Sequence, residues 1–277
     1  MFRKVIAFLL GLILVSSCRL TESEQQARIS ETPIPSPAST KTPLPPTSTL
    51  AIQPTNLIDE VFLTPTALTP PEKEYQLCSP LAEHAISDLP GIVSDPYAPP
   101  PMGKDDRHQG VDFAYYNQGG RASIEGEGVT AILPGRVAAL LNDRLPYGNM
   151  VMIETQRDDL WPELIQGLEI APDESLYHLY AHLGQSPLVS LGQPIECGQR
   201  IGEAGKTGYN VPVPHLHLEI RIGPAGNIFE SMAFYDTRAT AEEMDNYKLW
   251  RMSGTFRHLD PMRIFTEYWL EPSESEK

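Results

Sequence analysis

The chain has 277 residues and a formal net charge of −15, with 21 lysines and arginines against 36 aspartates and glutamates. A nucleic-acid partner requires clustered basic side chains to neutralise phosphates, so this balance argues against one. Without an N-terminal leader roughly 260 residues remain, enough for one large domain or two small ones.

Residues 1–17 have the pattern of a secretory signal peptide. A short basic start precedes an apolar run over residues 5–15, which is too short to remain in a bilayer as a spanning helix. The run ends in Val15-Ser16-Ser17-Cys18, which resembles the lipobox of bacterial lipoproteins. This resemblance implies cleavage before Cys18, a lipid on its thiol and an extracytoplasmic, membrane-anchored protein. The alternative is a plain secretory signal with an incidental cysteine.

Residues 18–74 are dominated by Thr, Pro and Ser, as in Pro43-Leu44-Pro45-Pro46. Such a segment cannot bury enough apolar surface to offset the entropy of ordering it, so we predict a disordered tether. A tether of this length would let an anchored domain search a layer of cell wall. We predict one domain over residues 75–270 and a flexible tail over 271–277.

Two cysteines remain once Cys18 is assigned to the lipid. In an oxidising compartment Cys78 and Cys197 could form a disulfide that joins the start of the folded region to its later half. The alternative is two separate buried thiols.

The folded region has short apolar runs separated by Pro, Gly and Asn, which predict strands and turns of a mainly β, antiparallel domain. These runs are residues 129–133, 137–141, 150–153 and 216–220. Two segments, 156–175 and 229–253, interrupt this rhythm. Within the second, Thr240-Ala241-Glu242-Glu243-Met244 predicts a short surface helix.

Two histidine motifs have spacings that suit a metal. His108 and Asp112 lie four residues apart with Gly110 between them, and an extended backbone would turn all three toward one centre. An imidazole and a carboxylate form a partial ligand shell for zinc.

The second motif is His215-Leu216-His217-Leu218-Glu219, in which the polar residues share one strand face and the leucines the other. Two protonated imidazoles would repel each other, so a metal that needs them neutral explains the pair.

A third run, Tyr177-His178-Leu179-Tyr180-Ala181-His182-Leu183, also alternates. Alternation predicts that His178, Tyr180 and His182 share one face of a strand.

The three motifs occur in an order that resembles the LytM/lysostaphin-type zinc peptidases, the M23 family. The likeness covers about residues 106–222. Further matching segments are residues 128–137, 147–153, 191–208 and, beyond that range, the Asp-Pro turn at 258–261. The resemblance implies a small antiparallel β-sheet with a groove across it, of the duplicated-hybrid-motif type.

Position by position, the resemblance implies one zinc ion held by His108, Asp112 and His217, with a fourth coordination position left for water. It implies that His215 is the general base and that His182 faces the developing oxyanion or the leaving amine. The roles of these two histidines could be shared or exchanged.

Five further polar residues have weaker signals. Tyr180 and Glu219 either orient the ligands or are ordinary packing residues. We predict structural roles for His178, His84 and His258, because no motif supports another.

The implied function is a zinc-dependent endopeptidase that cuts peptide stems or cross-bridges of peptidoglycan, with no obligate protein partner. One alternative is a non-catalytic scaffold that binds the wall or activates a separate amidase. Another is an envelope peptidase for protein or bacteriocin-like substrates. Residues 210–214 and Leu218 depart from the family pattern, and the two interrupting segments would flank the groove. Residues 75–104 could fill it as a latency peptide.

Overall fold

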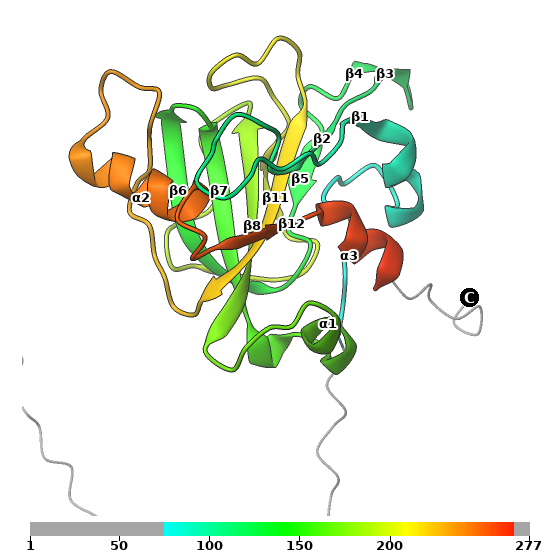
Figure 1. Ribbon diagram of the computed structural model, residues 1–277. Helices are drawn as coiled ribbons and strands as arrows, with labels where there is room; N and C mark the ends of the chain where they lie inside the picture. The colour runs from blue at the N-terminus through cyan, green and yellow to red at the C-terminus, as the bar shows by residue number, and fades with distance from the viewer. Residues whose placement is uncertain (1–74, 269–277) are drawn as a thin grey trace, which may run out of the picture. The chain divides into compact units, whose positions relative to one another are not determined.

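The structure, a computed structural model, describes residues 75–268 (Figure 1). The signal peptide over 1–17, the lipid on Cys18, the tether over 18–74 and the tail over 271–277 lie outside the described residues and stay predictions. Among the described residues, no helix combines the length and apolarity needed to cross a bilayer.

One large sheet organises the domain (Figure 1). Its strands follow the order β1-β2-β11-β8-β7-β6-β9, and β12 pairs with β11 beside β2. The bounds are β1 (Val93–Asp95), β2 (Val111–Phe113), β6 (Gly135–Arg144), β7 (Gly148–Gln156), β8 (Glu174–Leu183), β9 (Pro194–Ile195), β11 (Leu216–Pro224) and β12 (Arg257–Leu259). Two small sheets pair β3 (Tyr116–Gln118) with β4 (Arg121–Ser123) and β5 (Gly128–Thr130) with β10 (Arg200–Glu203). All these pairings are antiparallel, which confirms the predicted fold class.

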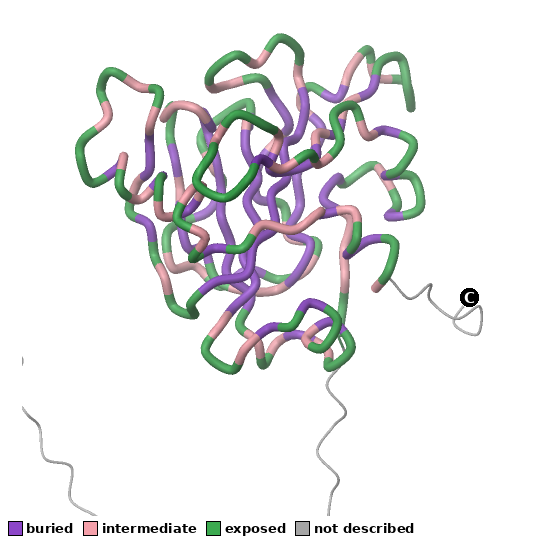
Figure 2. Tube along the Cα trace, viewed as in Figure 1, coloured by how far each residue is buried: buried purple, intermediate pink, exposed green. Residues whose placement is uncertain are grey.

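The sheet separates two hydrophobic cores, because alternate side chains of a strand point to opposite faces. In β7, Val151 and Ile153 belong to the first core, whereas Met150 and Met152 belong to the second. Figure 2 shows the buried residues concentrated along the strands and the exposed residues in the loops. The apolar runs that predicted strands therefore pack on both faces of the sheet.

Five short helices lie among the strands of the described residues. They are the 3-10 helices η1 (Ile86–Ile92) and η2 (Arg157–Asp159), and the α-helices α1 (Pro162–Gly167), α2 (Ala241–Arg251) and α3 (Pro261–Glu267). Helices η2 and α1 lie within the first interruption and line a groove of about 650 Å³ of their own.

Helix α2 confirms the helix predicted at residues 240–244 but extends it to Arg251. Thr240 and Glu243 form a reciprocal capping box that satisfies two free N–H groups at the start of the helix. The prediction of a mere surface helix is wrong, because Tyr247 and Trp250 are buried in the second core against the sheet. The buried face of α2 could not be predicted from the sequence, because Tyr247 and Trp250 are its only fully buried apolar residues and form no apolar stripe.

Cys78 and Cys197 form a disulfide with their Cα atoms 5.8 Å apart, which confirms the predicted pairing. The bond joins residues separated by 119 positions in the sequence. It ties the N-terminal extension to the loop between β9 and β10.

His178 is a structural residue of β8, as predicted. It is fully buried, with Nδ1 lying 2.7 Å from the Tyr180 hydroxyl and Nε2 lying 3.0 Å from Thr155 Oγ1. Burial lowers the pKa of His178 to about 3, so the folded protein keeps this imidazole neutral at physiological pH.

We expect His178 to make folding sensitive to mild acid. The unfolded chain takes up a proton at its ordinary pKa of about 6.5, so stability is retained above that pH and is lost as pH falls. Between pH 7 and pH 5 the loss should be about 2 kcal/mol in the free energy of unfolding. His178→Gln, which keeps hydrogen-bonding groups and does not titrate, should lower the acid-dependent loss of stability by that amount in denaturant titrations at both pH values. Equal acid sensitivity of the two proteins would contradict this role.

Candidate metal centre

Three predicted ligands converge on one point of the sheet. Asp112 on β2 is the direct cross-strand partner of His217 on β11, so both side chains project from the same face. His108 precedes β2 and turns toward the same point. Its Nε2 lies 3.0 Å from Asp112 Oδ1 and 3.0 Å from His217 Nδ1, while Asp112 Oδ1 lies 2.7 Å from His217 Nδ1. These three residues alone form a possible metal-binding group among residues 75–268.

The outer nitrogens of both histidines have acceptor partners, and these partners fix the tautomers. His108 Nδ1 lies 3.0 Å from the Pro96 carbonyl, and His217 Nε2 lies 3.2 Å from Glu219 Oε1. Because a carbonyl or carboxylate only accepts, each of these nitrogens carries the proton. In the neutral imidazoles, the lone pairs of His108 Nε2 and His217 Nδ1 therefore face Asp112.

This donor set fits zinc. Two nitrogen lone pairs and a carboxylate oxygen at such short separations repel one another unless a cation or a proton lies between them. Two imidazoles and one carboxylate, each imidazole held by an outer hydrogen bond, make a typical open catalytic zinc shell.

The charges of the cluster are tightly coupled. Burial raises the pKa of Asp112, but hydrogen bonds from His108 and His217 outweigh it, and the pKa is lowered well below its ordinary value. Burial lowers the pKa of His217, yet its bonds to Asp112 and Glu219 raise it to about 9. Without a metal, a proton therefore occupies part of the place that a cation would take.

The remaining two predicted site histidines lie beside the ligands. His215 Nε2 lies 3.5 Å from Asp112 Oδ2, and its Nδ1 donates to the Val213 carbonyl at 3.0 Å. The His182 ring lies 4.8 Å from that of His215 and 5.6 Å from that of His217, centroid to centroid. His182 Nδ1 donates to the Thr207 carbonyl at 2.9 Å, so its Nε2 also carries a lone pair.

The prediction that His178, Tyr180 and His182 share the site face is wrong. His178 and Tyr180 pair with Ile220 and Leu218 and face the first core, away from the ligands. His182 reaches the site because its φ of 62° and a register shift between β7 and β8 break the alternation. The Tyr180 hydroxyl instead accepts the backbone N–H of Ile132.

Glu219 does lie on the site face, as predicted, and it contacts His217.

His84 and His258 lie apart from the candidate ligands. His84 Nδ1 lies 2.9 Å from Glu127 Oε1, and His258 Nδ1 lies 2.6 Å from the Tyr97 hydroxyl.

Gly110 allows the β2 segment to approach the His217 ring. A Cβ at this position would lie 2.5 Å from the Leu218 carbonyl oxygen and 2.8 Å from His217 Cε1. The glycine predicted to permit a tight backbone path is therefore required by packing against a metal ligand.

Gly110→Ala should displace either β2 or the His217 ring. We expect overpacking to cost about 1–3 kcal/mol in the free energy of unfolding, together with weaker zinc binding. Gly91→Ala is the matched control, because a Cβ there meets no atom within 4 Å. Thermal melts and zinc titrations of both variants check this, and equal behaviour of the two would show that the contact does not constrain the site.

The ligands open onto a groove of about 720 Å³. Its walls come partly from the second interrupting segment, which contributes Tyr235, Tyr247 and Arg251. Tyr235 stacks on Tyr209 of the opposite loop, with ring centroids 6.1 Å apart and both side chains about half exposed. The expectation that this segment flanks the groove is confirmed. Residues 156–175 do not line this groove, so the same expectation for the first segment is wrong.

An antiparallel sheet that presents two histidines and an aspartate, with two further imidazoles beside them, has the composition of a hydrolytic metal centre. Residues 106–228 match the model of peptidase family M23. All five predicted site residues lie within the matched segment. No curated protein matches the chain at a significant level.

Several solved structures are similar to parts of the chain. The catalytic domain of the antimicrobial peptidase lysostaphin from Staphylococcus simulans is 24% identical, with a TM-score of 0.39 over 66% of this chain and 98% of that one. A variant catalytic domain of the prophage-encoded M23 protein EnpA from Enterococcus faecalis is 23% identical, with a TM-score of 0.34 over 50% and 87%. A zinc-containing peptidase from Vibrio cholerae is 27% identical, with a TM-score of 0.31 over 46% and 32%. The likeness to peptidase family M23 rests on the sequence match over residues 106–228.

Proposed function

We propose that the protein is a zinc-dependent endopeptidase that hydrolyses peptide bonds of peptidoglycan stems or cross-bridges. The observation that carries this proposal is the convergence of His108, Asp112 and His217, with two further imidazoles, each held by a backbone carbonyl at Nδ1, beside them. The M23 family match supports the reaction class.

Zinc, when bound by the three ligands, acts as a Lewis acid and lowers the pKa of a water to about 7. His215 is placed to take the proton of the attacking water, because its Nε2 faces the Asp112 carboxylate at the ligand cluster. The Val213 carbonyl holds the ring in the tautomer that this step needs.

His182 acts as a hydrogen-bond acceptor in this proposal. Burial, together with the charges of His217 and His215, lowers its pKa to about 3, so its neutral form prevails near pH 7. With the Nδ1 proton donated to Thr207, Nε2 can accept from the attacking water or from the leaving N–H group. It cannot donate to an oxyanion in this state.

The rival function is a scaffold without catalysis. A scaffold has no use for two imidazoles oriented by backbone carbonyls beside a complete ligand set, so the geometry favours the enzyme. Incubation of the purified protein with peptidoglycan, with zinc and then with a chelator, decides between them. New amino termini that appear only with zinc support the enzyme, whereas wall binding without cleavage supports the scaffold. Cleavage of a protein substrate alone would support an envelope protein peptidase.

We also propose that the protein works outside the cytoplasm, held to a membrane by the lipid on Cys18. The Cys78–Cys197 disulfide supports an oxidising compartment. Cys18→Ala should release the protein from the membrane fraction. Retention of that variant in membranes would contradict the lipid anchor.

A further inference from the structure

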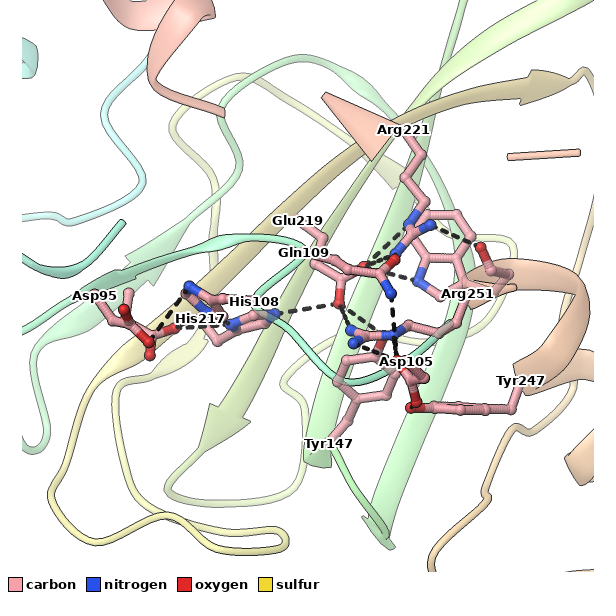
Figure 3. Close-up of polar contacts among 12 residues, drawn as sticks. Asp95, Asp105, His108, Gln109, Tyr147, His217, Glu219, Arg221, Tyr247 and Arg251 are labelled. Atoms are coloured by element: carbon pink, nitrogen blue, oxygen red, sulfur yellow. Dashed lines mark hydrogen bonds and ion pairs between the residues drawn. The ribbon is translucent and has the colours of Figure 1, made fainter. Parts of the chain in front are cut away.

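Glu219 is a fully buried carboxylate beside the metal centre with six donor contacts (Figure 3). Oε1 accepts from the Tyr147 hydroxyl at 2.8 Å, from Arg251 Nη1 at 2.5 Å and from His217 Nε2 at 3.2 Å. Oε2 accepts from Arg221 Nε and Nη2 at 3.0 and 2.7 Å and from Trp250 Nε1 at 3.1 Å. A buried carboxylate is stable only when it is paired in this way.

Two of these donors come from helix α2. Arg251 and Trp250 lie within the second interrupting segment, outside residues 106–228 that match the family. Figure 3 shows Glu219 between His217 on one side and Arg251 on the other. The second interrupting segment therefore both lines the groove and bonds to Glu219, the carboxylate that contacts His217.

Arg251 also pairs with a second carboxylate, that of Asp105. Asp105 Oδ1 accepts from Arg251 Nε at 2.7 Å, and Tyr247 donates to Asp105 Oδ2. Asp105 precedes the matched segment by one residue. The Arg251 side chain is 10% exposed and is paired with a carboxylate on each side, which restricts its orientation, so Arg251 can fix the position of Glu219.

The position of Glu219 matters for His217. The carboxylate oxygen that Arg251 holds is the one that accepts from His217 Nε2. This contact sets both the ring orientation and the tautomer that leaves the Nδ1 lone pair for a metal. Removing Arg251 would leave Oε1 with only Tyr147 and His217 as donors, while Oε2 would keep its two bonds from Arg221, so the carboxylate could turn away from His217.

We propose that Arg251 is a positioning residue of the metal centre, acting through Glu219 on His217, so that helix α2 completes the site. This role rests on the proposed function, because it presumes that His217 binds zinc. Trp250 contributes the same kind of support at the other carboxylate oxygen.

The test compares Arg251→Met with Lys248→Met in the full chain. Lys248 lies on the same helix and pairs with the exposed Asp245, so its loss removes an equal charge without touching Glu219. We expect Arg251→Met to weaken zinc binding by about tenfold to a hundredfold in chelator competition, with Lys248→Met unchanged. In turnover assays kcat should fall while KM stays the same.

Two further variants separate positioning from general damage to the fold. Arg251→Lys keeps the charge and one donor, so it should recover part of the zinc affinity. Trp250→Phe keeps the ring in the core and removes only the N–H donor to Oε2, so it should weaken zinc binding in a protein that still folds. Melting of the zinc-free proteins reports stability separately.

The outcomes distinguish this role from the proposed function. A wild-type protein that binds no zinc overturns both. A wild-type protein that binds zinc, with Arg251→Met and Trp250→Phe equal to Lys248→Met in affinity, overturns only the role of Arg251. Zinc binding without peptide hydrolysis overturns the endopeptidase and leaves the zinc comparison to decide the role of Arg251.

Discussion

Replacing His215 by alanine should lower kcat by about 10²–10⁴-fold, the usual contribution of a general base, while zinc binding is retained. His215 Nε2 lies 3.5 Å from Asp112 Oδ2. The group of three candidate ligands, His108, Asp112 and His217, is complete without either ring nitrogen of His215. The variant therefore loses the proton acceptor without losing the metal.

The measurement pairs turnover on peptidoglycan peptides with metal analysis of the same preparation. His84→Ala is the matched control, because His84 bonds to Glu127 rather than to the site. Activity close to wild type in His215→Ala would exclude this residue as the base. A larger loss of kcat in His182→Ala than in His215→Ala would indicate that His182, rather than His215, is the general base.

The candidate metal-binding group could be predicted from the sequence because two short motifs carry its residues. The alternation of Leu216 and Leu218 with His217 and Glu219 indicates a half-buried strand, and β11 has that pattern. His217 and Asp112 are direct partners across β11 and β2, so the register brings the two motifs together.

The role of β8 could not be predicted from alternation alone. A strand pattern assumes an unbroken period of two, and His182 adopts a left-handed conformation that turns its side chain to the other face. The family resemblance predicted a place for His182 at the site, and its ring lies 5.6 Å from that of His217, whereas the face assigned to Tyr180 followed from the pattern and was wrong.

The residues that hold Glu219 beside His217 were hard to predict from the sequence. Arg221 lies two residues after Glu219 on the same strand face, so a buried ion pair between them was foreseeable. Arg251 and Trp250 lie about thirty residues further along, in a segment without strand or motif signals. Only tertiary packing brings them to Glu219.

Asp112→Asn should remove most of the zinc affinity. Asp112 contacts three imidazoles, with His217 Nδ1 at 2.7 Å, His108 Nε2 at 3.0 Å and His215 Nε2 at 3.5 Å. Asparagine keeps the shape and one oxygen but loses the charge that draws a divalent cation. Removing a residue that only contacts a ligand usually lowers metal affinity by about 10–100-fold, and the loss of zinc affinity in Asp112→Asn should be larger.

Stability should follow the affinity, because a metal that binds the folded state alone stabilises it by mass action. Zinc at a thousand times its Kd adds about 4 kcal/mol to the free energy of unfolding, and a hundredfold rise in Kd reduces this to about 1.4 kcal/mol. The separation of the melting curves with and without a chelator should therefore be much smaller for Asp112→Asn than for the wild type. Asp95→Asn is the control, because Asp95 is exposed and lies 3.6 Å from the outer nitrogen of His108. Wild-type zinc affinity in Asp112→Asn would show that this carboxylate is not a ligand.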